Sequence, residues 1–402
     1  MKYVVTGATG YVGQMLVPLL EKEGHCVVVC GRSLEKLTKF YPTNDSATYE
    51  NLPYAMKGAD VIIHLAVLNN DRNYPEFEYD HVNVELTIEV ANQAKKAAVR
   101  EFFFISSIHA IQIGFDSKYA NSKREAVNRL EKIEGIRLSV IYLPTVYGPT
   151  WPQQLNILNS LGQNLAVILF RPIAAMKPTV NIARIADYLN CVKKDGLTSF
   201  RSDVILVDNI EQNNYYRVFR KTVDLTVSFA LIFGLGLIVM LVWLLIKIDS
   251  PGPGLFAQIR IGRNGSLFTC YKLRTMKLGT LQLGTHEQTE GQITRIGSFL
   301  RKFKFDEIPQ VINILKGEMT LVGPRPCLPV QTNLISERKD LRVLDALPGI
   351  TGLSQVQNID MSNPSILAHC DAKYLKLRSI LLDIKIIIAT IRGRGFGDKI
   401  SK

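Results

Sequence analysis

The feature that most constrains this chain is an apolar run without a charged residue, Leu225 to Ile246, in the middle of its 402 residues. At about 22 residues, the run is long enough to cross the hydrocarbon core of a membrane, roughly 30 Å, as a helix. Arg217 and Lys221 precede the run and Lys247 follows it, so positive charge flanks both ends. Positively charged flanks tend to stay in the cytoplasm. The sequence therefore predicts a re-entrant helix hairpin, with a single span as the alternative.

The net charge of +12 is unevenly distributed along the chain. Residues 1–215 hold 22 Lys and Arg against 22 Asp and Glu, whereas residues 216–402 hold 26 against 14. A basic half that begins with an apolar run indicates an anionic membrane surface or a phosphorylated substrate. Nucleic acid is not expected, because no basic run is interleaved with aromatic residues. The six cysteines are scattered without a CxxC pair, which indicates neither zinc nor disulfides and fits a reducing cytosol.

The N-terminal segment predicts a nucleotide-binding turn. A strand pattern, KYVVTGATG, opens the sequence, so no cleaved signal peptide is expected. Gly7, Gly10 and Gly13 lie between this strand and a helical pattern. Glycines at such a turn let the backbone approach a pyrophosphate, which the helix N-terminus attracts. The alternative is a glycine-rich turn without a ligand. After the second strand, Arg32 stands where an acidic residue would hold a ribose hydroxyl, so NADP(H) is favoured over NAD unless Arg32 is an ordinary exposed residue.

Residues further along the first half predict a doubly wound parallel sheet with a catalytic group. Segments 59–67 and 100–108 read as buried parallel strands separated by helices. Ser107 closes the second of these strands, and Tyr119 and Lys123 follow it four residues apart, on one face of a helix. The Lys123 ammonium is expected to lower the pKa of the Tyr119 phenol, and Ser107 to orient the reacting oxygen.

These motifs resemble an extended short-chain dehydrogenase/reductase of the nucleotide-sugar epimerase and dehydratase type. The resemblance covers residues 1–210 and rests on TGATGYVG, HLA, VNV, SS, YANSK and LPTVYGP, in this order. It implies a Rossmann-like fold in which Tyr119 donates or accepts the proton, Lys123 activates it and Ser107 completes the catalytic group. Two departures are evident. SSIHAIQ lacks the Val-Tyr-Gly common in the family, and only about 60 residues separate Gly148 from Asn209. The sugar site is therefore expected to be trimmed or shared with the second half, and an inactive domain remains the alternative.

In the second half, a carboxylate pair follows a helical pattern. Ile296, Phe299 and Phe303 recur at helical spacing beside basic residues, and Asp306 and Glu307 follow. Such a helix can lie in the headgroup plane and hold the carboxylates at the level of a lipid phosphate. One carboxylate can attack a phosphoryl group while its neighbour helps to hold Mg²⁺. Spacing alone also allows a solvated charge cluster.

The surrounding motifs resemble the bacterial sugar transferase family, the monotopic polyprenyl-phosphate phosphoglycosyl transferases. They are PGPGLFAQIRIG, KLRTM, TRIGSFLRKFKFDEIPQ, GPRP and PGITGLSQV, spread over about 150 residues. The resemblance implies transfer of a sugar 1-phosphate from a UDP-sugar to undecaprenyl phosphate, through a phosphosugar-enzyme intermediate with Mg²⁺ and with release of UMP. Asp306 matches the nucleophile and Glu307 its partner, and both are candidate metal ligands.

Four basic residues of these motifs are candidates for gripping phosphates, with plain ion pairs as the alternative. They are Lys272, Arg274, Arg301 and Arg325. The apolar run departs from the family, whose small members carry Ser-Pro in its middle. Here Gly234 and Gly236 occupy that region, and glycine permits a bend without imposing one.

The expected organisation is an NADP-binding reductase or epimerase-like domain over residues 1–210, a linker and membrane helix over 211–249, and a small α-rich transferase domain over 250–402. The leading hypothesis is a bifunctional enzyme of surface glycan assembly at the cytoplasmic face of a bacterial inner membrane, with an NADPH-dependent 4-keto-sugar reductase. The alternatives are a membrane-anchored oxidoreductase acting on a lipid, and a transferase with a regulatory NADP-binding domain. The sugar is not identified, and homo-oligomerisation is left open.

Overall fold

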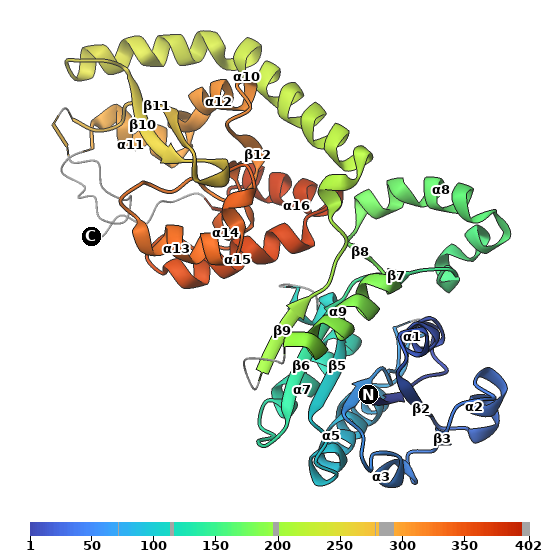
Figure 1. The fold of residues 1–402 in the computed structure, drawn as a ribbon. Coiled ribbons are helices and arrows are strands. Elements are labelled where there is room, and N and C mark those ends of the chain that lie inside the picture. The colour runs from blue at the N-terminus through green and yellow to red at the C-terminus, as the bar shows by residue number, and fades with distance from the viewer. Residues whose placement is uncertain (71, 113–115, 196–200, 278, 281–292, 396–402) are drawn as a thin grey trace. The chain divides into compact units, whose positions relative to one another are not determined.

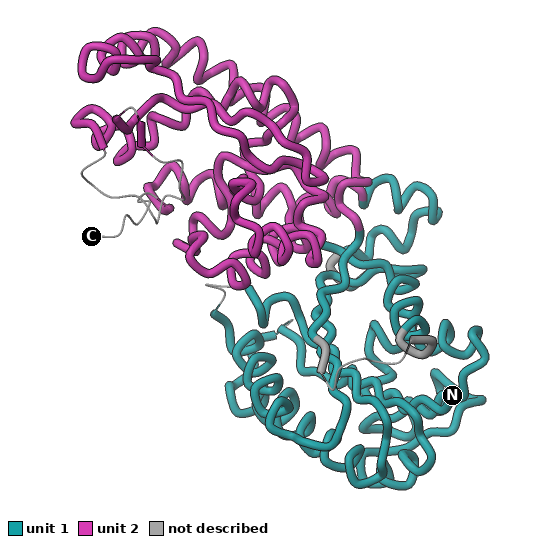
Figure 2. The backbone as a smooth tube through the Cα atoms, turned by 60° about the vertical axis from the view of Figure 1, so that its left-hand side comes forward, with its two compact units in different colours: residues 1–170, 178–208 teal, residues 171–177, 209–402 magenta. Residues whose placement is uncertain are grey.

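The computed structural model describes residues 1–70, 72–112, 116–195, 201–277, 279–280 and 293–395 (Figure 1). The chain forms two compact units, coloured separately in Figure 2. The first comprises residues 1–170 and 178–208, and the second comprises 171–177 and 209–402. Each unit is considered by itself below.

The first unit is built on a seven-stranded sheet in which every neighbouring pair is parallel. Its strand order is β3-β2-β1-β4-β5-β6-β9. The strands are β1 (Lys2–Thr6), β2 (Cys26–Cys30), β3 (Ser46–Ala47), β4 (Val61–His64), β5 (Glu101–Ser107), β6 (Arg137–Leu143) and β9 (Arg201–Ile205). The order reverses between β1 and β4, and dinucleotides bind beside the carboxyl ends of the strands at such a point. The predicted Rossmann-like parallel sheet is confirmed.

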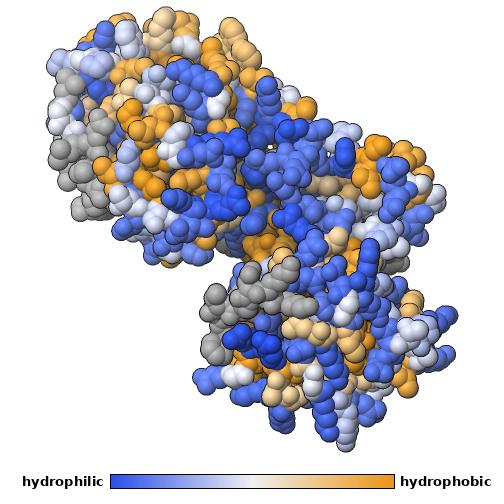
Figure 3. Space-filling view, in the orientation of Figure 1, coloured by the Kyte–Doolittle hydropathy of each residue, from blue (hydrophilic) through white to orange (hydrophobic). Residues whose placement is uncertain are grey.

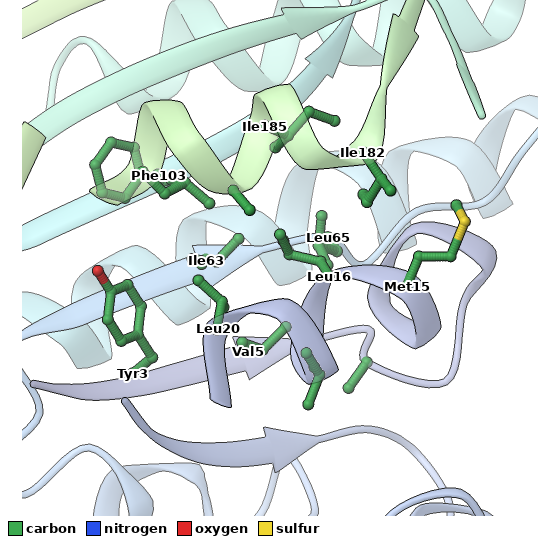
Figure 4. Packing of buried hydrophobic residues seen from close by; sticks show 14 of the residues in the cluster. Tyr3, Val5, Met15, Leu16, Leu20, Ile63, Leu65, Phe103, Ile182 and Ile185 are labelled. Atoms are coloured by element: carbon green, nitrogen blue, oxygen red, sulfur yellow. The ribbon is translucent and has the colours of Figure 1, made fainter. Parts of the chain in front are cut away.

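Helices cover this sheet because its central strands are apolar on both faces. Leu16 and Leu20 of one helix pack with Val5 and Ile63 of the sheet, and Ile185 of another helix joins the same cluster (Figure 4). The longer helices are α1 (Tyr11–Lys22), α2 (Leu34–Phe40), α5 (Leu86–Lys96), α7 (Lys118–Leu130) and α9 (Ile182–Asp195). Short elements between them are α3 (Leu52–Ala55), α4 (Glu76–Tyr79), η1 (Asp80–Glu85) and α6 (Ile108–Ile111).

A short region replaces the large substrate lobe that the resemblance would imply. Strands β7 (Thr145–Tyr147) and β8 (Thr179–Asn181) pair in parallel as a small separate sheet. Between them lie η2 (Gln153–Ser160) and the apolar helix α8 (Gln163–Met176). The segment that could contact a sugar is therefore short, as expected from the roughly 60 residues between Gly148 and Asn209.

The second unit begins with helix α10, Asn214–Asp249, 36 residues long. Among the residues that the structure describes, it is the helix long and apolar enough to cross a membrane by length and composition. The helix runs unbroken through Gly234 and Gly236, so the two arms of the expected re-entrant hairpin are not separate helices. Figure 1 shows instead that its ribbon changes direction partway along. A glycine within a helix costs only about 1 kcal/mol, so glycine alone does not interrupt it.

The remainder of the second unit packs along α10. Arg220 donates from Nε to Thr320 Oγ1 (3.1 Å) and from Nη2 to the Val322 carbonyl (3.0 Å), and Asp224 accepts from Thr320 Oγ1 (2.8 Å). Near the other end, Ile246 shares a buried cluster with Leu273 and Leu300. Hydrogen bonds thus hold the beginning of α10, and apolar packing holds its end.

The elements of this unit form two small sheets and a set of short helices. The antiparallel pair is β10 (Leu255–Ile261) with β11 (Leu267–Leu273), and the parallel pair is β12 (Thr320–Val322) with β13 (Gly349–Thr351). The helical elements are η3 (Ile210–Gln212), η4 (Arg263–Gly265), α11 (Arg295–Lys302), η7 (Phe305–Gln310), α12 (Val311–Leu315), α13 (Thr332–Asp340), η8 (Val343–Asp345), α14 (Leu353–Val356), α15 (Pro364–Leu377) and α16 (Ile380–Ile391).

Candidate active sites

The three glycines of the first turn have different surroundings. A Cβ on Gly7, whose φ is +70°, would lie 2.6 Å from the Ala66 nitrogen, and one on Gly13 would lie 2.3 Å from the Ala8 carbonyl oxygen. A Cβ on Gly10 would meet only the Gly7 oxygen, at 3.2 Å, and otherwise open space. Gly7 and Gly13 therefore permit close packing, while Gly10 leaves room above the start of α1. This arrangement fits a pyrophosphate at the helix N-terminus.

Arg32 follows the last residue of β2 and is exposed. The next residue, Ser33, caps α2 by accepting from the Lys36 nitrogen (3.3 Å). Tyr49 was not singled out from the sequence, yet its side chain lies near the Gly7 backbone and the Thr6 side chain. Burial raises the pKa of Tyr49, and nearby Arg32 opposes that rise. No periodic or spacing signal marks Tyr49, because it follows a two-residue strand.

Lys123 lies deep under the carboxyl end of β5 and is 2% exposed. Its Nζ donates to the Ile105 carbonyl (3.2 Å) and lies 4.7 Å from the centre of the Phe104 ring. Burial lowers the pKa of the Lys123 ammonium to about 7. Both contacts therefore come from the strand next to its helix, and neither comes from a carboxylate.

Tyr119 shares the α7 face with Lys123, and the Ser107 side chain at the end of β5 lies near its phenol. Burial raises the pKa of the Tyr119 phenol more than nearby Ser107 lowers it. The shift is opposite to the one expected from the sequence, because burial outweighs the influences that would lower the pKa of the phenol. The structure nevertheless brings Ser107, Tyr119 and Lys123 together.

Two polar residues of the sequence motifs fix the surroundings of this group. His64, from HLA, contacts Thr6 Oγ1 through Nδ1 (2.8 Å) and Thr87 Oγ1 through Nε2 (3.1 Å). Burial, with a contribution from Lys123, lowers the His64 pKa to about 3, so the ring is neutral. Asn83, from VNV, donates to Ser122 Oγ (3.0 Å) on α7. These residues hold β1, β4 and α7 in place.

The second candidate site contains the carboxylate pair. Asp306 and Glu307 lie in η7, directly after α11, and are only 8% and 7% exposed. Lys304 makes the turn between the two helices with a left-handed backbone, φ 54°. The pair is therefore buried by a sharp turn, which excludes the solvated cluster that spacing alone allowed.

Glu307 accepts from two cations on the same oxygen, Oε1. Lys272 Nζ on β11 lies at 2.8 Å and Arg325 Nη2 at 3.1 Å. Burial alone would raise the pKa of the Glu307 carboxyl, but Lys272, Arg325 and Lys304 together lower it well below its usual range. Glu307 therefore stays ionised throughout the neutral range.

A pocket opens beside these residues. Its lining consists of Arg260, Cys270, Lys272, Glu307, Gln310, Arg325, Pro326, Gly349 and Ile350. Arg260 was missed from the sequence. Its Nη1 donates to the Pro326 carbonyl (3.0 Å), and burial together with Arg325 lowers its pKa to about 10. Three basic side chains in one small pocket suit a ligand with several phosphate charges.

Arg274 and Arg301 make other contacts and do not line the pocket. The Arg274 guanidinium donates to the carbonyl oxygens of Ser250 and Pro251 (2.9 Å for Pro251), at the C-terminus of α10. Arg301 Nε donates to Thr275 Oγ1 (2.9 Å). Of the four expected phosphate-binding residues, Lys272 and Arg325 come together, whereas Arg274 secures the end of α10.

The comparisons with known proteins match the two halves of the chain to two different families. Residues 215–395 match the bacterial sugar transferase family, and residues 3–161 match the NAD dependent epimerase/dehydratase family. An uncharacterized sugar transferase, EpsL, of Bacillus subtilis is 33% identical over 175 residues, which are 44% of this chain and 86% of that protein. The chain belongs to the bacterial sugar transferase family. Its first half is an epimerase/dehydratase domain.

Longer relatives match a similar share of this chain. An undecaprenyl-phosphate glucose phosphotransferase of Komagataeibacter xylinus is 39% identical over 43% of this chain, and the chain covers 35% of that relative. A UDP-glucose:undecaprenyl-phosphate glucose-1-phosphate transferase of Xanthomonas campestris pv. campestris is 34% identical over 45% of this chain and 40% of its own length. The chain thus spans well under half of either protein. A crystal structure of UDP-galactose 4-epimerase covers 52% of this chain and 78% of its own, at 19% identity and a TM-score of 0.42.

Proposed function

We propose that the second unit transfers a sugar 1-phosphate from a UDP-sugar to undecaprenyl phosphate. The observation that carries the proposal is a buried carboxylate pair whose second member, Glu307, is held ionised by Lys272 and Arg325. The names of the relatives, which specify undecaprenyl-phosphate sugar phosphotransfer, support it.

In the proposed first step, a carboxylate oxygen of Asp306 attacks the β-phosphorus of the UDP-sugar. The bond from that phosphorus to the bridging oxygen breaks, and UMP leaves with the electron pair. In the second step, a phosphate oxygen of undecaprenyl phosphate attacks the same phosphorus, and the Asp306 carboxylate leaves. Two anionic substrates then never occupy the site together. Lys272, Arg260 and Arg325 hold the phosphate oxygens of each substrate in turn.

The donor set fits a Mg²⁺ ion. Asp306 and Glu307 are adjacent, buried and oxygen-bearing, and Mg²⁺ is commonly held by one or two carboxylates together with substrate phosphates. Within the described ranges, no group of three or more His, Cys, Asp or Glu could hold a metal by itself. Substrate oxygens would therefore complete the shell, and the ion would neutralise their charge.

Trapping the intermediate tests this mechanism. Purified protein is incubated with a panel of UDP-sugars and Mg²⁺ but no lipid acceptor, and its intact mass is followed together with UMP release. We expect a mass gain of one sugar phosphate, mapped to Asp306, and none in Asp306→Asn. Asp345→Asn, an exposed carboxylate, is the matched control and should keep the adduct. An adduct on Glu307, or normal transfer by Asp306→Asn, would show that the nucleophile is misassigned.

We also propose that the first unit binds NADPH and reduces a 4-keto sugar. The open space at Gly10, the exposed Arg32 and the group of Ser107, Tyr119 and Lys123 support this assignment. A bound nicotinamide would supply a hydride to the carbonyl carbon, while Tyr119 would give a proton to the carbonyl oxygen and Ser107 would orient that oxygen. Loss of nicotinamide absorbance with a UDP-4-keto sugar, absent in Tyr119→Phe, is the expected result. A cofactor that binds stoichiometrically but is never oxidised would favour a regulatory domain instead.

For the membrane, we propose that both ends of α10 lie on the cytoplasmic face of the inner membrane. The flanking cations Lys221 and Lys247, and the change of direction of the helix in Figure 1, support a re-entrant path. Single cysteines at 221 and 247 should both resist a membrane-impermeant reagent added from the periplasm. Labelling of one position alone would establish a span.

A further inference from the structure

Helix α8 presents an apolar stripe to its surroundings. Leu165, Ile168, Leu169, Ile173 and Met176 are between 38% and 53% exposed. Their spacing of i, i+3, i+4, i+8 and i+11 puts them on one side of the helix. Figure 3 shows hydrophobic side chains gathered over this part of the molecule. We call these five residues the α8 stripe.

The opposite side of α8 already has its partners. Ala166 and Phe170 are buried, and the Phe170 ring lies 4.6 Å from the Trp151 ring and 4.8 Å from the Tyr147 ring, centre to centre. The part of α8 up to Phe170 therefore packs on the first unit through these residues, and the α8 stripe is not used for that packing.

The last turn of α8 is fixed to the beginning of α10. Ala175 shares a buried cluster with Tyr216, and the Arg171 carbonyl accepts from Asn213 Nδ2 (2.8 Å). Tyr215, whose side chain is exposed, lies in the first turn of α10 together with the cation Arg217, and Lys221 follows one turn later. Aromatic and positively charged residues just before an apolar run mark the headgroup level of a bilayer.

The charge of α8 also fits a position at the headgroup level of a bilayer. No acidic residue occurs from Gln163 to Lys177, and Arg171 and Lys177 are both exposed. An amphipathic helix with an apolar stripe and basic flanks lies in the plane of an anionic membrane surface. A basic rim gives a second copy of this chain no complementary acidic surface on the same helix, so homodimerisation through α8 is disfavoured.

We propose that the α8 stripe rests in the cytoplasmic leaflet, as a second membrane contact beside α10. The proposal rests on the proposed membrane insertion of α10. It makes α8 a membrane contact of the segment through which the chain passes from the first unit into the second.

The test is local quenching of a fluorophore in the full-length protein. Cys26→Ser and Cys191→Ser first remove the exposed thiols. Single cysteines then replace Ile168 on the α8 stripe, Phe233 on α10, and Phe77, an exposed apolar residue of α4. Each carries an environment-sensitive label, and the protein is reconstituted at one copy per nanodisc of phosphatidylethanolamine and phosphatidylglycerol. Doxyl-labelled lipids report on membrane depth, and iodide reports on exposure to water.

We expect doxyl quenching at position 168 to be several times larger than at 77 and to approach that at 233. Strong iodide quenching at 168 with little doxyl quenching would overturn the proposal, because the stripe would then face water. Protection of position 168 from both quenchers would also overturn it, because a protein surface would cover the stripe. Absence of doxyl quenching at 233 would refute the membrane insertion of α10 itself, independently of α8.

Discussion

Lys123 in the first unit and Glu307 in the second are both buried ionisable groups at candidate active sites. Their surroundings shift the balance between the charged and the neutral form in opposite directions. Lys123 contacts a carbonyl and a phenyl ring, and burial lowers its pKa to about 7. Glu307 is also buried, yet three cations lower its pKa well below the usual range despite burial. Burial thus disfavours the charged form of Lys123, whereas the neighbouring cations favour the charged form of Glu307.

The difference matches the chemistry proposed for each unit. A group that takes part in proton transfer works best when its pKa is close to the working pH. Phosphoryl transfer instead needs fixed charges that stabilise oxygen anions without changing protonation state. We therefore expect pH to affect the two units differently, and substitutions at the two sites to have different consequences.

Lys272→Met should produce the largest effect on the second unit. Removing one partner of a buried ion pair costs about 3–5 kcal/mol, and a loss of that size in transfer efficiency is roughly 10²- to 10⁴-fold. Because burial raises the Glu307 pKa and Lys272 is the strongest opposing influence, the variant should also lose activity at a higher pH on acidification. UMP release measured from pH 5 to 8 gives both results.

Lys316→Met is the matched control, because Lys316 is exposed and contacts only the Tyr271 side chain on the neighbouring strand in the contacts observed. It should leave the rate and pH profile unchanged. If Lys272→Met reduces donor binding without moving the acid limb, Arg325 and Lys304 keep Glu307 ionised without Lys272, and the contrast with Lys123 would not depend on Lys272.

Lys123→Met should remove a pH dependence of stability from the first unit. The folded protein binds the Lys123 proton with a pKa of about 7, and the ordinary value is 10.5. Between these values the unfolded chain binds more protons, so the free energy of unfolding rises with pH, by about 2 kcal/mol from pH 7 to 9. Urea unfolding followed through Trp151 in a Trp243→Phe background measures this slope.

Lys118→Met, at an exposed position of the same helix, should retain the slope. An unchanged slope in Lys123→Met would mean that Lys123 keeps its charge in the folded protein. The proposed contrast with Glu307 would then fail, and Lys123 would be a permanent cation like Lys272.

The sheet and both candidate catalytic groups could be predicted from the sequence because their signals are local. Gly7, Gly10 and Gly13 need only a strand and a helix on either side, and Asp306 and Glu307 are adjacent. Arg260 and Tyr49 carried no such signal, because tertiary packing brings them to their sites from β10 and from the residue pair after β3. Arg274 illustrates the opposite error. It lies two residues after Lys272, but β11 ends at Leu273, so alternation along the strand no longer places both side chains together.

Arg32→Asp should have a smaller effect, on cofactor choice. Arg32 is exposed, whereas Lys272 and Arg325 are partly buried, so water and salt screen its interaction with a 2′-phosphate. We expect NADPH to bind roughly tenfold or more tightly than NADH, the value of one charge-assisted hydrogen bond, and the variant to narrow or invert this preference. Equilibrium titration of both cofactors at two salt concentrations tests it, with Lys36→Met as the control. Equal affinities in the unaltered protein would contradict the assignment of NADP(H).

Arg274→Met should have the smallest effect on transfer, although Arg274 belongs to the same sequence motif as Lys272. Its guanidinium donates to carbonyl oxygens at the end of α10, where a cation also suits the helix dipole. Its loss should therefore lower the free energy of unfolding of the second unit by about 1–3 kcal/mol and leave the KM for the UDP-sugar unchanged. Arg274→Lys retains the charge and should lose less stability, so it gives a folded variant for kinetics if Arg274→Met does not fold. A rise in the donor KM for Arg274→Lys comparable to that for Lys272→Met would make Arg274 a phosphate ligand. The cations that bind phosphate in this unit would then include Arg274, which lies outside the pocket at the C-terminal end of α10.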